Sequence, residues 1–389
     1  MRFVFLTGEY PPYSGGVGEY TWNVAQSLQR RGATVQVIVF QEPSGPQERG
    51  TYFVGGPLNP ANWRRASRII NRASKNSILL VQYVPQMYGL LGMNLAWVLW
   101  LCRLHANSFW LMFHEVHFVA AKGASWKHHL LALITQNMSK RLARKADRCF
   151  VSISAYGGYI EKFTRVGVQP EWLPVPSNVA VEADQEDVDR LRARLLRGEA
   201  DPLVGHFGTY RGTIRTLLRM LVAESRLLHP NWTFVFIGRG SREFLSELET
   251  QGVLPRGNAM ASGGVASTET ACWIKACDVM VQPYPDGVST RRTSLMAALA
   301  LGKATISNLG HLSDRFWEAS SSLYLAAHAD PCELVAAVST VLNDCRLRNQ
   351  LQVDAARCYA ERFSLERTLE ELETMAPRSR EPLASQRLA

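Results

Sequence analysis

The chain has 389 residues, of which 47% are hydrophobic and 20% are charged. A single hydrophobic core stops growing at roughly 250–300 residues, so the length predicts two domains, and the composition excludes an intrinsically disordered protein. The seven cysteines are scattered and form no C-x-x-C pair, which argues against a disulfide framework or a zinc site and favours a reducing, cytoplasmic compartment.

Basic residues are concentrated in the first half of the chain. Residues 1–180 carry 19 Lys and Arg against 8 Asp and Glu, whereas residues 181–389 carry 24 against 26. Cations beside tryptophans suit an anionic membrane surface or an anionic acceptor, and a solvated basic face explains the same charge. Nucleic acid is not expected as a partner, because no nucleic-acid-binding motif is present. The basic groups are Trp63-Arg64-Arg65 with Arg68 and Arg72, Trp126-Lys127-His128-His129, and Lys140-Arg141 with Arg144, Lys145 and Arg148.

Residues 1–180 alternate between strand and helix signals. Apolar spacing predicts a helix at Glu19–Arg30 that ends at Gly32. Continuous apolar strands separated by helices are typical of a parallel sheet covered on both faces, so we expect one α/β domain here. The predicted strands are Phe3–Thr7, Thr34–Phe40, Ile78–Gln82, Phe109–Phe113 and Cys149–Ile153.

The most apolar stretch of the chain is Leu90–Leu101. A transmembrane helix needs about 20 apolar residues, and this stretch is interrupted by Asn94 and followed by Arg103. We therefore expect a buried helix rather than a membrane span. The first apolar run, near Phe3, is too short for a signal peptide and is followed by Glu9.

A second doubly wound unit is predicted after a charged stretch. Residues 181–200 hold one charged helix, Asp187–Arg197, and no strand, so they are the expected linker. The alternation then restarts over residues 201–361, a final helix lies within 362–376, and the tail 377–389 is expected to be disordered. The predicted strands are Leu203–Phe207, Thr233–Ile237, Val279–Gln282 and Ala304–Ser307, and the predicted helices are Ile214–Leu228, Arg242–Gln251, Thr293–Leu301, Cys332–Asn343, Arg346–Ala360 and Leu365–Met375.

A pair of glycines, Gly15 and Gly16, joins the first strand to the first helix. Without a Cβ atom, the backbone can approach a bulky anion closely, and the free N–H groups of the helix start favour negative charge. A tight turn that binds no ligand explains the glycines equally well. The segment is neither G-x-G-x-x-G nor a Walker loop, so it does not directly imply a dinucleotide or ATP.

From Gly8 to Gly32 the sequence resembles the opening of bacterial family 4 glycosyltransferases. The resemblance implies the GT-B fold, in which two doubly wound, Rossmann-like domains face each other across a cleft, and retaining transfer of a sugar. It also implies that the Gly15-Gly16 loop lies beside the donor diphosphate and the acceptor. Further matches follow in order along nearly the whole chain: Phe113-His114-Glu115, Leu173–Asn178, Phe207–Tyr210, Gly238–Ser241, Gln282–Gly287 and Tyr359–Ser364.

His114 follows a predicted strand and so lies at the carboxyl edge of the first sheet. A neutral histidine there can hydrogen-bond a sugar hydroxyl, and the resemblance implies that His114 contacts the transferred sugar. His117 is the competing candidate, and a purely structural histidine is the alternative.

Cations should stabilise the departing diphosphate, because negative charge develops on it as the sugar bond breaks. Relatives supply an Arg and a Lys after the first strand of the second domain. Here the expected Arg position holds Thr209, and Arg211 and Arg215 lie near enough to replace the pair. Ordinary surface arginines are the alternative.

Two turns of the second domain resemble the parts that line the nucleotide. Arg239 lies in the turn after the second strand and is a further phosphate or acceptor candidate. Gly264 and Val265 lie where relatives use backbone groups to hold the base. For Arg239, a plain strand-to-helix turn is an equal alternative.

The segment from Asp286 to Ser294 is the most informative. Its hydroxyls and paired arginines open a predicted helix and suit an anion at the helix start. Most relatives carry two glutamates here, the second of which grips the ribose, and the alignment places Ser289 and Ala297 at these positions. Because both acids are missing, Asp286 is the nearest carboxylate that could take one role. The predicted ligand residues are Asp286, Ser289, Thr290, Arg291, Arg292, Thr293 and Ser294.

The resemblance implies a glycosyltransferase that moves a sugar from a nucleotide-diphosphate sugar to a hydroxyl acceptor. We expect no cofactor and no divalent metal, because no Asp, Glu or His cluster has metal-ligand spacing. The acceptor is expected to be a saccharide or a lipid-linked molecule of cell-surface polysaccharide or glycolipid synthesis, reached from the cytoplasmic face of the membrane. A nucleotide-sugar epimerase on the same fold and a non-catalytic nucleotide-binding protein are the alternatives.

Overall fold

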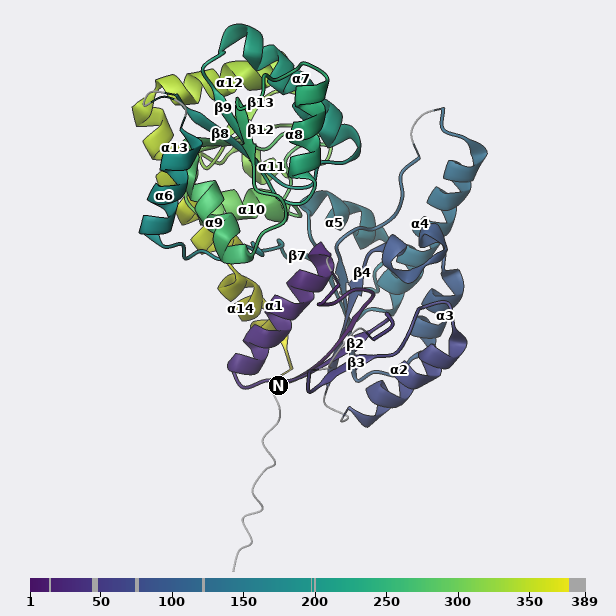
Figure 1. The fold of residues 1–389 in the computed structure, drawn as a ribbon. Coiled ribbons are helices and arrows are strands. Elements are labelled where there is room, and N and C mark those ends of the chain that lie inside the picture. The colour runs from purple at the N-terminus through teal and green to yellow at the C-terminus, as the bar shows by residue number, and fades with distance from the viewer. Residues whose placement is uncertain are drawn as a thin grey trace, which may run out of the picture. The chain divides into compact units, whose positions relative to one another are not determined.

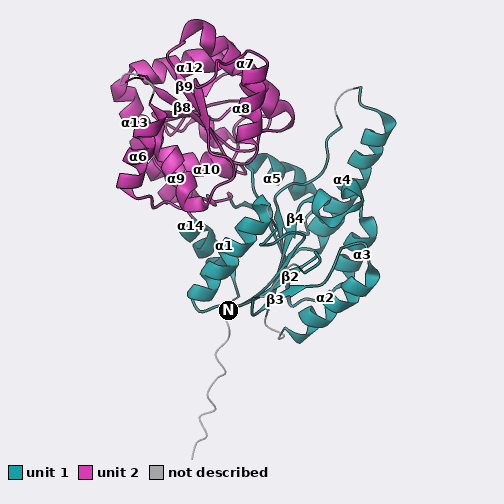
Figure 2. Cartoon of the chain, viewed as in Figure 1, with its two compact units in different colours: residues 1–173, 365–389 teal, residues 174–364 magenta. Residues whose placement is uncertain are grey.

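The computed structural model describes residues 1–13, 15–43, 48–73, 77–120, 123–196, 198 and 201–377. The chain forms two compact units (Figure 2). Unit 1 consists of Met1–Leu173 and the segment that begins at Leu365, and unit 2 consists of Pro174–Ser364. The expected tail, 377–389, lies outside the described residues apart from Pro377.

Unit 1 is built on a parallel sheet in the order β3-β2-β1-β4-β5-β6-β7. Its central strands β1, β4 and β5 are apolar and almost wholly buried, as expected for a sheet covered on both faces. The strands are β1 (Arg2–Thr7), β2 (Thr34–Val39), β3 (Thr51–Phe53), β4 (Ile78–Tyr83), β5 (Ser108–Phe113), β6 (Arg148–Val151) and β7 (Pro170–Trp172).

Helices cover both faces of this sheet (Figure 1). Helices α2 (Pro60–Arg72), α3 (Leu95–Arg103) and α4 (Trp126–Lys145) share one core with the strands, and α1 (Gly16–Arg30) and α14 (Leu365–Met375) lie together on the other face. The short helix α5 (Ser154–Ile160) packs against β7. The 3-10 turns are η1 (Pro85–Tyr88), η2 (Leu90–Gly92) and η3 (Glu161–Phe163).

The prediction of a buried helix over Leu90–Leu101 is wrong for the residues before α3. Leu90 and Leu91 are 54% and 82% exposed and have left-handed backbone conformations, with φ of 52° and 54°. Asn94 ends this irregular segment, because its side chain accepts a hydrogen bond from the Trp97 N–H and thereby caps α3. The apolar stretch is therefore divided into an exposed turn and a buried helix.

Unit 2 contains a second parallel sheet, in the order β10-β9-β8-β11-β12-β13. The strands are β8 (Leu203–Phe207), β9 (Thr233–Ile237), β10 (Ala259–Ala261), β11 (Val279–Val281), β12 (Thr305–Asn308) and β13 (Tyr324–Ala326). The helices are α6 (Gln185–Leu195), α7 (Gly212–Leu228), α8 (Ser241–Thr250), α9 (Ser267–Ala276), α10 (Thr293–Ala300), α11 (Arg315–Glu318), α12 (Pro331–Asn343) and α13 (Cys345–Cys358), followed by the π-helical turn η4 (Tyr359–Phe363).

The expected linker, 181–200, lies within unit 2. Its helix α6 packs against α9 and buries Val188 and Leu195 in a core cluster of this unit. The high charge of this stretch comes from the exposed face of α6, which carries Glu186, Asp187 and Arg190. A charged, amphipathic helix on the surface of a domain was therefore mistaken for a connection.

The last helix, α14, returns to unit 1. It packs on α1 and buries Leu369 and Leu372, and the Arg31 Nη1 atom lies 2.9 Å from the Glu373 Oε2 atom. None of the helices that the structure describes is long and apolar enough to cross a bilayer.

Candidate functional site

In both sheets, the strand order reverses at one point, where consecutive connections leave in opposite directions. In unit 2 this point lies between β8 and β11, and in unit 1 it lies between β1 and β4. In open α/β sheets, ligands bind outside the carboxyl ends of the strands at such a point. The segments that follow these four strands contain most of the predicted site residues.

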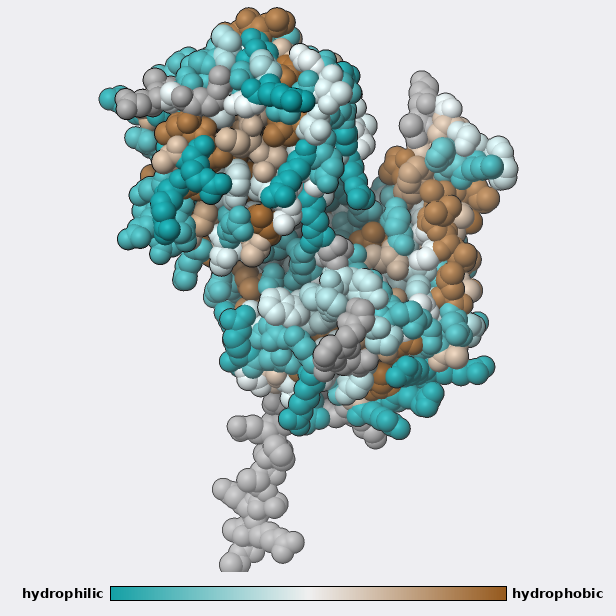
Figure 3. Space-filling model, viewed as in Figure 1, coloured by the Kyte–Doolittle hydropathy of each residue, from teal (hydrophilic) through white to brown (hydrophobic). Residues whose placement is uncertain are grey.

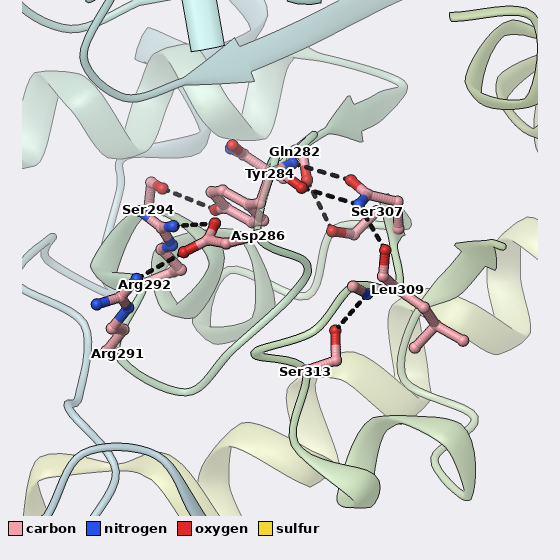
Figure 4. Close-up of polar contacts among 11 residues, drawn as sticks. Gln282, Tyr284, Asp286, Arg291, Arg292, Ser294, Ser307, Leu309 and Ser313 are labelled. Atoms are coloured by element: carbon pink, nitrogen blue, oxygen red, sulfur yellow. Dashed lines mark hydrogen bonds and ion pairs between the residues drawn. The ribbon is translucent and has the colours of Figure 1, made fainter. Parts of the chain in front are cut away.

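Asp286 joins the two predicted phosphate-binding arginines into one cluster (Figure 4). Its Oδ2 atom lies 2.6 Å from the Arg291 Nη2 atom, and its Oδ1 atom pairs with the Arg292 Nη2 atom. Burial acts to raise the pKa of the Asp286 carboxyl, but Arg292 and Arg291 outweigh it, so this pKa lies below its usual value. The cluster therefore contains two guanidinium groups and one carboxylate, which holds both arginines at the start of α10.

Tyr284 supports this cluster and was missed by the sequence analysis. The Arg292 Cζ atom lies 4.8 Å from the centroid of its ring, and its hydroxyl is 3.0 Å from the Ser294 Oγ atom. A guanidinium over an aromatic face is held by the ring quadrupole, so Arg292 is kept at this position. Burial raises the pKa of Tyr284 to about 12, and the hydroxyl is therefore a neutral hydrogen-bonding group.

The end of β12 fixes the loop that carries Tyr284. The Asn308 side chain accepts a hydrogen bond from the Tyr284 N–H at 2.9 Å and donates one to the Tyr284 carbonyl at 2.8 Å. The Ser307 hydroxyl donates to the Gln282 carbonyl at 2.7 Å, as Figure 4 also shows. Two polar residues of a neighbouring strand thus determine the path of the loop.

The loop also depends on Gly287, which has a φ of +91°. A Cβ atom at this position would overlap the Gly310 nitrogen and the Ser313 Oγ atom. Two turns therefore pass each other at a distance that only glycine allows. The Gly310 N–H donates a 3.0 Å hydrogen bond to the Ser313 Oγ atom beside this crossing (Figure 4).

Two of the predicted ligand residues in this loop lie in the interior instead. Ser289 and Thr290 are both fully buried, and the Thr290 N–H and hydroxyl bind the Asp314 carboxylate at 2.9 and 3.1 Å. Ala297, the other position of the missing glutamates, is buried in a core cluster. The structure does not support the expected contact of Thr290 with a ligand, because its side chain is bound to Asp314. The buried Ser289 Oγ atom has no partner among the described residues, and its contact with a ligand stays a prediction.

Four helices of unit 2 that follow strands on either side of the reversal between β8 and β11 begin without a side-chain cap from the preceding residue. This holds for α7 after β8, α8 after β9, α9 after β10 and α10 after β11. By contrast, α6, α12 and α13 of the same unit are capped by Asp184, Asp330 and Asp344. Helix starts without a cap leave N–H donors and a partial positive charge available to an anion. In α10, the Tyr284 hydroxyl accepts one of these hydrogen bonds, from the Leu295 N–H. Thr293, the first residue of α10, and Ser294 add hydroxyls to one of these starts.

The two arginines expected to replace the diphosphate cations have different surroundings. Arg211 is the residue before α7, next to the carboxyl end of β8, and its side chain is exposed. Arg215 forms an ion pair with Glu247 of α8, and its guanidinium packs over the Phe244 ring at 5.8 Å. Of the pair, Arg211 is the better placed to meet a ligand, because the charge of Arg215 is compensated.

Arg239, Gly264 and Val265 form a second group around the ends of β9 and β10. Arg239 is exposed in the turn between β9 and α8, and its side chain lies against Gly264, where a Cβ atom would be 3.0 Å from its Cγ atom. Gly264 is exposed and Val265 is half-buried. The structure thus brings together the three residues that the resemblance places near the nucleotide.

Two buried polar residues beside the reversal were also missed. His206 on β8 contacts the Val281 carbonyl at 2.9 Å through Nδ1, whereas its Nε2 atom has no partner among the described residues. Burial lowers the pKa of His206 to about 4. The Gln282 amide follows β11 and also has no partner in the described part of the chain. A lone histidine or glutamine at a strand end gives no periodic signal, so only the strand order could have indicated them.

In unit 1, His114 is fixed by contacts with β4 and α1. Its Nε2 atom lies 2.7 Å from the Gln82 Oε1 atom of β4, its N–H donates to the Tyr83 carbonyl at 3.0 Å, and its ring contacts the edge of Tyr20 on α1 at 5.0 Å. Burial lowers the pKa of His114 to about 3, so the imidazole is neutral at neutral pH. With the Gln82 oxygen as acceptor, Nε2 carries the proton and Nδ1 can accept a hydrogen bond.

The carboxylate of Glu9 holds the start of α1. Its Oε1 atom accepts hydrogen bonds from the N–H groups of Val17 at 2.9 Å and Gly18 at 3.1 Å, and a Cβ atom on Gly15 would overlap this carboxylate. Gly15 and Gly16 were expected to bring these N–H groups to a ligand phosphate. Instead, an acid of the chain itself occupies two of the donors, and Gly15 makes room for it.

No protein-family model matches the sequence, and no curated protein matches it. Solved structures do. Sucrose-phosphate synthase from Thermosynechococcus elongatus is similar with a TM-score of 0.75 at 16% identity, covering 96% of this chain and 98% of that protein. HepE from Anabaena, in complex with UDP and glucose, gives a TM-score of 0.69 at 14% identity, with 96% and 98% covered. WaaG, a glycosyltransferase involved in lipopolysaccharide biosynthesis, gives 0.66 at 14% identity, with 96% and 99% covered.

The chain has the GT-B fold. The predicted α/β architecture with two doubly wound sheets is thereby confirmed. Membership of family 4 and the assignment of individual site residues stay predictions, because similarity at this level of identity shows the fold alone.

Proposed function

We propose that this chain is a retaining glycosyltransferase that moves a sugar from a nucleotide-diphosphate sugar to a hydroxyl acceptor. The observation that carries the proposal is the group of uncapped helix starts around β8 and β11, next to the Arg291–Arg292 pair. Fixed N–H donors and cations stabilise the charge that develops on a departing diphosphate. The similar GT-B structures support the proposal, since HepE was solved with UDP and glucose.

In unit 2, Arg292 and Ser294 at the start of α10 and Arg211 at the start of α7 would bind the diphosphate. Arg239, Gly264 and Val265 would line the nucleoside. In a retaining reaction without a protein nucleophile, the bond to the departing phosphate oxygen breaks on the same face on which the acceptor oxygen attacks. That phosphate oxygen then takes the acceptor proton, so the protein is required to hold charge and to exclude water.

In unit 1, His114 would accept a hydrogen bond from a hydroxyl of the transferred sugar through Nδ1. Its neutral state suits this role, because an imidazolium could only donate. Gln82 would act as a positioning residue, since its amide sets the ring orientation. The acceptor is proposed to be a saccharide or a lipid-linked molecule of cell-surface polysaccharide or glycolipid synthesis. The seven free cysteines suit a reducing, cytoplasmic compartment.

We also propose that transfer needs no divalent metal. No group of three or more metal-ligating side chains is present among the described residues, and the carboxylate of Asp286 is already bound by two arginines. Activity should therefore be equal in EDTA and in magnesium. A requirement for magnesium would contradict this part of the proposal.

Calorimetry with UDP, GDP and ADP tests donor binding. We expect one of them to bind, and we expect Arg291→Ala combined with Arg292→Ala to weaken its binding about tenfold or more, because each charge-assisted hydrogen bond contributes roughly 1.5–3 kcal/mol. Arg256→Ala is the matched control, since Arg256 is exposed on the same unit outside these loops. If no nucleoside diphosphate binds at millimolar concentration, the chain is a non-catalytic scaffold. A loss of nucleotide binding would agree with the structure, because Ser289 and Ala297, which occupy the positions of the missing glutamates, are buried.

A further inference from the structure

The first half of α4 is almost entirely unburied. The buried residues of this helix begin at Thr135, and none of the nine residues Trp126–Ile134 is buried, of which Ile134 alone packs partly against the core of unit 1. Figure 1 shows the start of α4 extending away from the sheet of unit 1. A helix that packs against its own domain normally buries one stripe along its whole length. The anchoring residues are Thr135, Met138, Ser139, Leu142 and Ala143.

This exposed half carries an apolar stripe. Trp126, Leu130 and Leu133 are 70%, 42% and 65% exposed, and their i, i+4, i+7 spacing places them on one side of the helix. Val119, in the segment before α4, is 73% exposed. Hydrophobic side chains gather along α4 on the surface drawn in Figure 3. Exposed apolar groups that line up in this way mark a binding surface.

The helix layer that contains α4 is strongly cationic. Helices α2, α3 and α4 carry no Asp or Glu at all. The four arginines of α2 are exposed, and none has a carboxylate partner among the described residues. By contrast, α14 on the opposite face of the same sheet carries four glutamates. The cations are Arg64, Arg65, Arg68 and Arg72 on α2, Arg103 on α3, and Lys127, Lys140, Arg141, Arg144 and Lys145 on α4.

Direct contacts join the three helices into one surface. The rings of Trp63 on α2 and Trp100 on α3 stack at 6.0 Å, and the Trp100 Nε1–H donates to the Ser67 Oγ atom at 3.1 Å. Helix α3 in turn packs along α4, where the Cys102 thiol lies 3.7 Å from the Arg141 carbonyl oxygen. The apolar stripe and the basic residues of α2, α3 and α4 therefore belong to the same layer of unit 1.

We propose that this layer docks on an anionic lipid bilayer, with the apolar side chains at the start of α4 inserted at the boundary between the headgroups and the acyl chains. Tryptophan and leucine side chains partition into that interface, and each nearby Lys or Arg strengthens binding to anionic lipid. Nucleic acid would also attract the cations, but it would leave Leu130 and Leu133 in water. The bilayer is therefore the partner that uses both properties of the surface.

Sedimentation of the full-length chain with vesicles tests the proposal without any substrate. Vesicles of phosphatidylcholine alone are compared with vesicles that also contain phosphatidylglycerol, at low and at high salt. We expect binding only to the anionic vesicles, and we expect it to weaken with salt, because free cations are screened. A single-stranded oligonucleotide is the competing probe.

Two variants test the contributions of the apolar stripe and of the basic residues to vesicle binding separately. The triple substitution Trp126→Ser, Leu130→Ser and Leu133→Ser should weaken vesicle binding at least tenfold, and Arg64→Gln, Arg65→Gln and Arg68→Gln together should weaken it about a hundredfold. All six side chains are exposed, so both variants should fold. Leu227→Ser with Leu228→Ser is the matched control, because these leucines are 80% and 59% exposed on α7 of unit 2.

The depth of Trp126 gives an independent readout. Brominated lipids should quench wild-type fluorescence more than that of Trp126→Phe, because bromine quenches only indoles that reach the acyl region. Unchanged vesicle binding by the serine variant would overturn the proposal. Tighter binding to the oligonucleotide than to anionic vesicles would overturn it as well, and would identify nucleic acid as the partner.

Discussion

The Oε1 atom of Glu9 lies 2.9 Å from the backbone nitrogen of Val17, so a carboxylate that follows the first strand holds the start of the first helix. A second hydrogen bond, from the Gly18 N–H, completes this arrangement. The carboxylate is therefore a cap that comes from outside the helix, and Gly15 is required because a side chain there would displace it.

Loss of this cap should destabilise unit 1. For Glu9→Ala we expect a decrease in the free energy of unfolding of about 1–2 kcal/mol, which is the usual cost of removing a helix cap. Glu9→Gln keeps one acceptor oxygen, so it should lower the free energy of unfolding by about half as much as Glu9→Ala. Urea titration followed by circular dichroism measures both variants. Glu161→Gln, an exposed substitution in the same unit, is the control, and equal midpoints for all of the variants would contradict the capping role.

The two buried histidines should make the protein sensitive to mild acid. Burial lowers the pKa of His114 to about 3 and that of His206 to about 4, from 6.5. Below pH 6.5 the unfolded chain binds protons that the folded chain does not, so stability falls as the pH decreases towards these values, by up to about 1.4 kcal/mol per pH unit and histidine. Thermal unfolding between pH 8 and pH 5 should therefore depend less on pH in His114→Gln than in the wild type. The exposed His105→Gln variant should keep the wild-type slope, and an unchanged slope in His114→Gln would refute the prediction.

The ion cluster of Asp286 should stabilise unit 2 at all pH values above the usual range of a carboxyl group. Asp286→Asn leaves two partly buried guanidinium groups without their carboxylate, which we expect to cost about 1–3 kcal/mol at pH 7. Because Arg292 and Arg291 hold the pKa of Asp286 below 3.8 although burial opposes them, this stability is lost only as the pH falls through the lowered value. The difference between variant and wild type should thus persist from pH 7 to about pH 4. A difference that disappears near pH 5 would show that the carboxyl is not held by the arginines.

The crossing of the turns at Gly287 and Gly310 can be tested with two alanine substitutions. Gly287 and Gly257 both have left-handed backbones, with φ of +91° and +80°, but a Cβ atom overlaps neighbouring atoms only at Gly287. Gly257→Ala should cost roughly 1 kcal/mol through backbone strain alone. Gly287→Ala should cost at least about 2 kcal/mol more, because the loop or its neighbour has to move. Similar melting temperatures for the two variants would contradict the close packing.

The fold could be predicted from the sequence because the strands of both sheets are continuous apolar runs. Strands β8 and β9 have the expected bounds, and helix α14 does too. The four edge strands β3, β7, β10 and β13 were not predicted, since each has only three residues. The position of α6 was not predicted either, because composition alone does not distinguish a charged surface helix from a linker.

The candidate site was harder to predict because its partners are distant in the sequence. The sequence predicted Arg291 and Arg292 as ligand residues, but it did not indicate that Asp286 would form ion pairs with both. The sequence predicted that Gly15 lies beside a ligand phosphate, whereas in the structure the carboxylate of Glu9 lies against Gly15. Intramolecular ion pairs such as these depend on side-chain directions, and a motif does not specify those directions. By contrast, His114 was located correctly at a strand end, since the carboxyl edge of a parallel sheet follows from strand order alone.

Unit 1 is assembled from both ends of the chain, because α14 returns to pack on α1 after the whole of unit 2 has been traversed. During synthesis, the ribosome therefore releases the last piece of the first unit only after the second unit has emerged. Unit 2, by contrast, is one continuous segment and can fold as soon as Ser364 has left the exit tunnel. A released chain that is truncated after Ser364 should consequently contain one finished unit, the later one in the sequence, and an earlier one whose α1 surface is still uncovered.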